Sequence, residues 1–161
     1  MTTLDRSTPS LSATGRKTLL LMIPLNLLMV PWVWIGRFVF GVYGWFALIL
    51  LPVALVVAIA LLVTTIMAFT QKQRPRSLSG PEVFWQWATW AGLFAFGAFL
   101  PDFGDTEESY QSALTRLFGQ SDALMNVSYT LAFGGAILAV VAWVGLLISL
   151  THGHRRETPA S

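Results

Sequence analysis

The sequence predicts an all-α, polytopic membrane protein with four transmembrane helices and a short amphipathic helix in the loop between the third and fourth. Two observations lead to this fold class. Hydrophobic residues make up 55% of the 161 residues and charged residues only 11%, against about 25% charged in a soluble domain. The run from Trp45 to Phe69 has no charged side chain, and at about 1.5 Å per residue it can cross a hydrocarbon core of roughly 30 Å.

The expected first span covers residues 18–36 and contains Pro24 and Pro31. Each proline removes a helical hydrogen bond, and neighbouring helices of a bundle can satisfy the freed carbonyl group. Asn26 lies between the two prolines, and we expect it to hydrogen-bond across a helix interface. The alternative is that Asn26 belongs to a polar site. Arg37 follows the span beside an aromatic cluster, which favours a side chain extended to the lipid head groups over an intramembrane functional site.

The expected second span covers residues 45–69 and is apolar around its whole circumference, which predicts contact with both lipid and protein. The third span is expected at 83–101. Ala88, Gly92 and Ala95 follow one side of it, and small residues let a neighbouring backbone approach closely. Its opposite side is aromatic, which favours packing or lipid contact over a quinone or cofactor pocket.

The fourth span is expected at 125–150 and is also free of charge. Gly134, Gly135 and Ala139 give it a second surface of small residues. We expect this surface to pack against the small residues of the third span, because both permit close approach of backbones.

The segment 102–124 is the longest stretch between spans. Asp105 and Glu108 have the spacing of a capping box, and apolar residues then recur at helical spacing, which predicts a short amphipathic helix on the membrane surface or against the bundle. A surface that could dock a basic partner is formed by Asp102, Asp105, Glu107, Glu108 and Tyr110. A solvated loop and a divalent-cation site are the alternatives, and the acids lack the EF-hand spacing.

The positions of the basic residues predict the orientation. With four spans and cytoplasmic tails at 1–17 and 151–161, only Arg37 and Arg116 fall outside. The basic residues on the cytoplasmic side are then Arg6, Arg16, Lys17, Lys72, Arg74, Arg76, Arg155 and Arg156. This agrees with the positive-inside rule for short loops. The content of Ala, Gly and Trp favours a bacterial inner membrane, so the predicted location is the plasma membrane.

Several chemistries are missing from the sequence. The chain has no cysteine, which excludes disulfides, thiolate metal sites and thiol nucleophiles. The spans carry no His, Lys, Asp or Glu away from their ends, and proton-coupled or cation-coupled transport usually requires an acid there. No phosphate-binding loop, nucleophile elbow or zinc-protease motif is present. We therefore expect no catalytic residue, no cofactor, no metal and no nucleic-acid partner.

These observations favour a small non-catalytic membrane protein that acts as an accessory or structural subunit, with membrane lipid and other membrane-protein subunits as its partners. The alternative is a homo-oligomeric permease or channel for a small solute, which would need a polar path at the seam between copies. A membrane enzyme that uses the carboxylates of the segment 102–124 is a third hypothesis.

Overall fold

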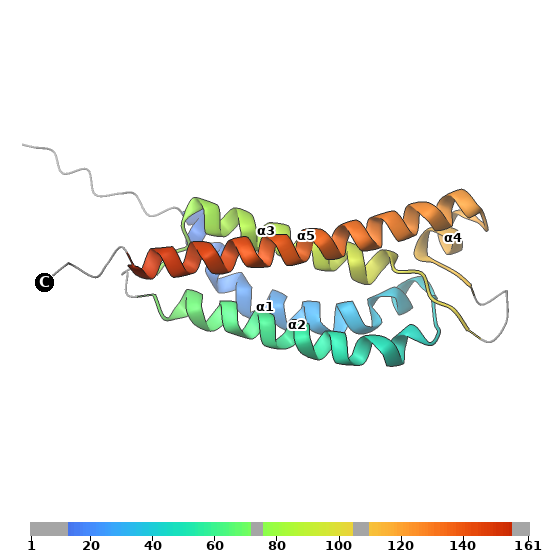
Figure 1. Ribbon diagram of the computed structural model, residues 1–161, viewed down its shortest axis with the longest axis horizontal. Coiled ribbons are helices and arrows are strands. Elements are labelled where there is room, and N and C mark those ends of the chain that lie inside the picture. The colour runs from blue at the N-terminus through green and yellow to red at the C-terminus, as the bar shows by residue number, and fades with distance from the viewer. Residues whose placement is uncertain (1–12, 72–75, 105–109, 156–161) are drawn as a thin grey trace, which may run out of the picture.

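Four long helices lie alongside one another in the computed structural model, which describes residues 13–71, 76–104 and 110–155, with side chains as far as residue 152 (Figure 1). A short 3₁₀ helix follows the first long helix, and a short α-helix precedes the last. The elements are α1 (Ala13–Ile35), η1 (Gly36–Phe40), α2 (Phe46–Phe69), α3 (Gly80–Phe99), α4 (Ala113–Phe118) and α5 (Asp122–Arg155). In the described residues, β pairing is limited to one antiparallel bridge between Asp102 and Gln111.

The chain runs back and forth between two ends of the bundle (Figure 1). At one end, here called the loop end, the backbone N–H of Leu78 donates to the carbonyl oxygen of Gly15 at 3.4 Å. At the other, here called the α4 end, the backbone N–H of Trp45 donates to the carbonyl oxygen of Phe103 at 3.0 Å. Each long helix is therefore antiparallel to the next one along the chain.

Three segments are long and apolar enough to cross a membrane: Ala13–Phe40, Phe46–Phe69 and Asp122–His152. The sequence-based expectation of an all-helical chain with membrane-sized helices is confirmed at this level. The helix α3 has 20 residues and is not among these three segments. Its polar side chains Glu82, Gln86 and Thr89 are all buried.

The buried face of each long helix is a narrow seam. Along α5 the buried positions recur at steps of three and four, which is the spacing by which helices pack side by side. They are Met125, Ser128, Ala132, Gly135, Ala139, Ala142, Leu146 and Leu150. The seam of α2 is equally narrow, and consists of Leu50, Ala54, Leu61, Thr64 and Ala68.

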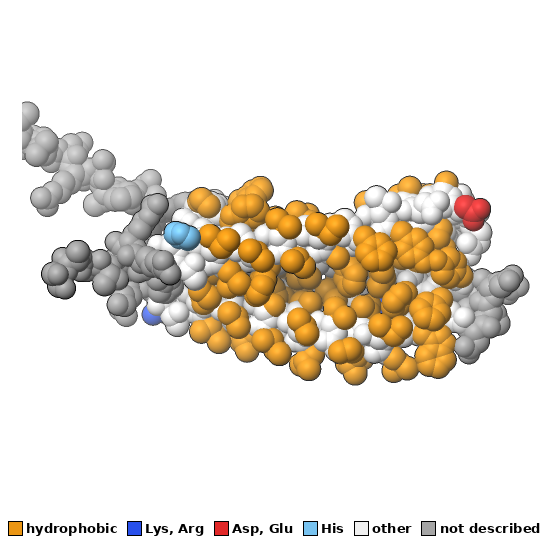
Figure 2. Space-filling view, in the orientation of Figure 1, with side chains coloured by type: hydrophobic (Ala, Val, Ile, Leu, Met, Phe, Trp, Pro, Cys, Tyr) orange, Lys and Arg blue, Asp and Glu red, His pale blue; other side chains and the backbone are white. Residues whose placement is uncertain are grey.

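Large apolar side chains cover the surface outside these seams. Figure 2 shows apolar side chains along the whole length of the visible face, with an acidic side chain at the α4 end and basic and histidine side chains at the loop end. Leu27 is 74% exposed, Leu48 66% and Val56 65%. Exposure of so much apolar surface to water is unfavourable. A surface of this kind is therefore typical of a bundle surrounded by lipid or by other apolar helices.

The closest helix contact joins α3 to α5. A Cβ atom added at Gly92 would lie 2.5 Å from the backbone nitrogen of Ala139 and 2.6 Å from the carbonyl oxygen of Gly135. A Cβ atom at Gly135 would lie 2.9 Å from the Cβ atom of Ala95. The two backbones therefore approach more closely than any larger side chain would allow at these positions.

One of the expected packing residues lies elsewhere. Gly134 is exposed, and a Cβ atom added there would meet nothing within 4 Å. Adjacent residues of an α-helix point about 100° apart, so Gly134 turns away when Gly135 faces α3. Ala88 is half-buried. The surface of small residues on α5 is therefore made by Gly135 and Ala139, without Gly134.

We predict that Gly92→Ala lowers the unfolding temperature of the protein in detergent, because its new methyl group must displace the α5 backbone, and overpacking of this kind costs about 1–3 kcal/mol. Gly134→Ala is the matched control, since it also replaces a helical glycine but enters open space. It should leave the unfolding temperature unchanged or raise it slightly. Equal unfolding temperatures for the two variants would contradict the observed contact between α3 and α5.

Candidate functional site

The most strongly buried charges in the described residues form an ion pair at the α4 end. The Nε atom of Arg37, on η1, lies 2.6 Å from Oδ2 of Asp102, just after α3, and both side chains are 0% exposed. This is the one salt bridge among the described residues. The guanidinium group also donates through Nη1 to the carbonyl oxygen of Trp34 at 3.2 Å, and its Nη2 atom has no protein partner.

The Asp102 carboxylate also binds backbone. Its Oδ1 atom accepts from the N–H of Phe46 at 3.0 Å and from the N–H of Phe103 at 2.9 Å. The backbone of Asp102 exchanges hydrogen bonds in both directions with Gln111. A side chain at Gly44 would collide with the carboxylate. Asp102 thus ties together η1, the first turn of α2 and the segment leading to α4.

Burial of this pair corrects two expectations. Arg37 does not extend to the lipid head groups, because a carboxylate within the fold neutralises it. Asp102 is not part of an accessible docking surface, because its oxygens are bound to the protein's own donors. Tyr110 is 43% exposed and hydrogen-bonds to Tyr129. The other expected docking residues, Asp105, Glu107 and Glu108, lie outside the described residues.

The helix expected after Asp105 is shorter than the pattern indicated and begins later. α4 starts at Ala113, and Ser112 caps it by accepting a hydrogen bond from the N–H of Thr115. The Ser112 hydroxyl also accepts one from Ser128 of α5, at 2.7 Å. Leu117 and Phe118 are 61% and 73% exposed. Tyr110 precedes the helix and is not a member of it.

A second buried polar cluster joins α1, α2 and α3 nearer the loop end. Oδ1 of Asn26 accepts from Nε1 of Trp90 at 2.7 Å, and Nδ2 of Asn26 donates to Oγ1 of Thr65 at 2.8 Å. Gln86 donates through Nε2 to the same Oδ1 atom at 3.5 Å. Asn26 therefore bonds to both neighbouring helices. We refer to Asn26, Thr65, Gln86 and Trp90 as the amide cluster.

Glu82 is the buried acid closest to the amide cluster along α3. It belongs to a capping box, in which one carboxylate oxygen accepts from the backbone N–H of Ser79 at 2.7 Å. The other oxygen accepts from Nε2 of Gln71 at 3.2 Å. Both carboxylate oxygens thus fix the start of α3 and the end of α2 to each other.

An apolar layer separates the amide cluster from the ion pair. Between Asn26 and Arg37, the buried side chains of α1 are Met29 and Val33. On α3, Leu93 fills the corresponding part of the core. The polar groups at the two ends are therefore not connected through the middle of the bundle by any described side chain.

Both clusters consist of hydrogen bonds, with one ion pair at the α4 end. No group of three His, Cys, Asp or Glu side chains is placed to hold a metal in the part of the chain that the structure describes. The oxygens of the two buried carboxylates, Asp102 and Glu82, accept hydrogen bonds from the protein. Comparisons of the chain with protein-family models, curated proteins and solved structures give no match.

The positions of Arg37 and Asp102 in the sequence do indicate that the two can pair. Arg37 and Asp102 each follow an expected span, the first and the third, by a single residue. Chains that run back and forth bring those two span ends to the same side. An unpaired cation and an acid at the same end of a bundle are candidates for pairing, because isolated buried charges are costly.

We predict that Asp102→Asn destabilises the protein by about 3–5 kcal/mol, since it leaves the buried guanidinium group of Arg37 without a counter-charge. Unfolding in detergent, followed by circular dichroism, measures the change. The control is Asp122→Asn at the exposed first turn of α5, where loss of a favourable helix-dipole interaction costs under about 1 kcal/mol. Combining Arg37→Met with Asp102→Asn should recover part of the loss. Equal stability of the two single variants would refute a structural role for the pair.

Proposed function

We propose that the protein crosses the plasma membrane of a bacterial cell four times and serves as a non-catalytic accessory or structural subunit of a larger membrane complex. The observation that carries this proposal is that buried polar groups bond to one another at two separated levels. Among the described residues, the apolar side chains of Met29 and Val33 separate the two levels, and no group of acids or histidines is placed to hold a metal. The outward faces are apolar and suit lipid or the helices of other subunits.

A fourth crossing by α3 is supported by its length and its packing. Twenty residues extend about 30 Å as an α-helix, which is the thickness of the hydrocarbon core. Its buried side carries Glu82, Gln86 and Thr89, so these groups need not contact lipid. Its exposed side chains include Phe84 and Trp87, at 63% and 51% exposure.

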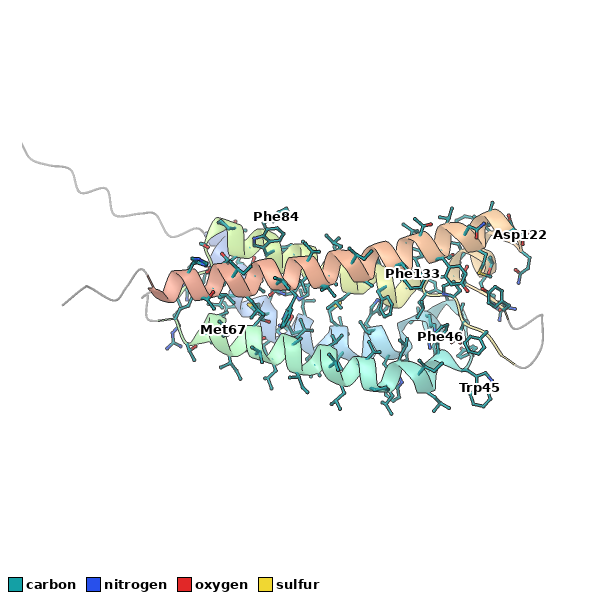
Figure 3. The ribbon with its side chains drawn as sticks, in the orientation of Figure 1. Trp45, Phe46, Met67, Phe84, Asp122 and Phe133 are labelled. Atoms are coloured by element: carbon teal, nitrogen blue, oxygen red, sulfur yellow. The ribbon has the colours of Figure 1, made fainter. Side chains whose placement is uncertain are left out.

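The α4 end has the composition of a membrane interface. Tyr43 is 62% exposed and Trp45 47% exposed, and Figure 3 shows Trp45 at this end, pointing away from the bundle. Tyr and Trp are enriched at the boundary between hydrocarbon and head groups. The exposed Leu117 and Phe118 of α4 suit contact with the same layer.

The orientation follows from the basic residues. Arg16, Lys17 and Arg76 lie near the loop end, whereas the α4 end holds Arg116 and the neutralised Arg37. Cytoplasmic loops carry the excess of Lys and Arg. We therefore propose that the loop end and both termini face the cytoplasm.

We predict that single cysteines introduced at Thr70 and Gln120 react on opposite sides of the membrane. The native chain contains no cysteine, and both positions are exposed at opposite ends of the bundle. A membrane-impermeant maleimide applied to intact cells should label Gln120→Cys at once and Thr70→Cys only after lysis. Thr151→Cys, at the end of α5, should behave like Thr70→Cys. Labelling of Thr70→Cys and Gln120→Cys from the same side would show that α3 does not cross the membrane.

We also predict that the protein, expressed from its native locus and extracted in a mild detergent, migrates in a complex that contains other membrane proteins. Mass spectrometry of the purified complex identifies these partners. A complex built solely from copies of this chain would contradict the accessory role and favour the alternative, a homo-oligomeric permease or channel with its path at the seam between copies.

A further inference from the structure

The orientation of the Asn26 amide is determined by Trp90. An indole N–H is a donor and never an acceptor, so the atom of Asn26 that lies 2.7 Å from Nε1 of Trp90 must be the oxygen. The amide nitrogen of Asn26 then faces Thr65. The oxygen and nitrogen of the Asn26 amide are thus assigned from the hydrogen-bonding chemistry of Trp90.

The Asn26 amide in turn orients Gln86. Its Nε2 atom faces the oxygen of Asn26 at 3.5 Å, and the opposite orientation would bring two oxygen acceptors together. Oε1 of Gln86 must therefore point away from Asn26. The side chain is 0% exposed, and this oxygen has no protein donor.

Nearby hydroxyl groups already use their hydrogens. Thr65 donates to the carbonyl oxygen of Leu61 at 2.7 Å, and Thr89 donates to that of Trp85 at 2.8 Å. Buried polar atoms are nearly always hydrogen-bonded. The acceptor on Gln86 therefore calls for a donor that the surrounding helices do not supply.

We propose that Oε1 of Gln86 binds a single buried water molecule on the buried side of α3. Acceptors for the second hydrogen of the water lie on the same buried side of α3, with Glu82 one turn before Gln86 and Thr89 one turn after it. Buried waters typically make about three hydrogen bonds to polar groups that would otherwise be unsatisfied. The site goes beyond the proposed accessory function and does not depend on it.

The surroundings of the site differ on its two sides. Toward the loop end, the buried side of α3 carries Glu82, which bonds to Gln71. Toward the α4 end, Met29 and Leu93 belong to the apolar core. The proposed water therefore has further polar residues on the loop-end side and the apolar core on the other.

The direct test is an experimental structure of the full-length protein at a resolution that shows ordered water. The expected result is a density peak roughly 2.8 Å from Oε1 of Gln86, absent in Gln86→Leu and retained in the control Gln120→Leu, which alters an exposed residue of the same type. No peak in the wild-type protein at such resolution would overturn the proposal.

A second measurement needs no variant. Radiolytic hydroxyl labelling activates bound water, so Trp90 should be oxidised although it is only 4% exposed, while Met29, at 7% exposure in the apolar layer, stays protected. Protection of both residues would contradict a water site. The unfolding temperature should be the same in sodium, potassium, ammonium and choline chloride at equal ionic strength. A rise in potassium or ammonium alone would show that the occupant is a cation and overturn the assignment of water.

Discussion

The architecture depends on the close contact between α3 and α5. At Gly92 and Gly135 the two backbones leave no room for a Cβ atom, and in an apolar environment such close packing replaces the hydrophobic effect as the source of helix association. The contact has a second consequence for α3. Held between α5 and α1, it turns Glu82 and Gln86 into the bundle and presents aromatic residues outward.

The ion pair and the amide cluster lie at two levels of the bundle, because buried polar groups need hydrogen-bond partners within the protein. The ion pair of Arg37 and Asp102 connects the segments at the α4 end. The amide cluster around Asn26 connects three helices nearer the loop end. With Met29 and Val33 between them, these groups hold the described helices together at two separate levels of the bundle.

Much of the helical framework could be predicted from the sequence, because an uninterrupted apolar run such as 45–69 has few alternatives to a membrane-sized helix. The ends of the helices and the face of each small residue could not. Gly134 and Gly135 are adjacent and identical, yet Gly135 alone contacts α3. The start of α4 could not be predicted either, since Ser112 caps the helix and also bonds to Ser128 on α5, a contact that no local pattern reveals.

The sequence by itself determined that the chain is helical and apolar, because composition and the length of apolar runs depend on no particular neighbour. It also identified Asn26 as a polar group in need of a partner. The tertiary structure alone decided which partners are used: Trp90 and Thr65 for Asn26, and Asp102 for Arg37, 65 residues away. The physical reason is that a buried hydrogen bond or ion pair is a property of two surfaces brought together, and neither surface is complete within one stretch of sequence.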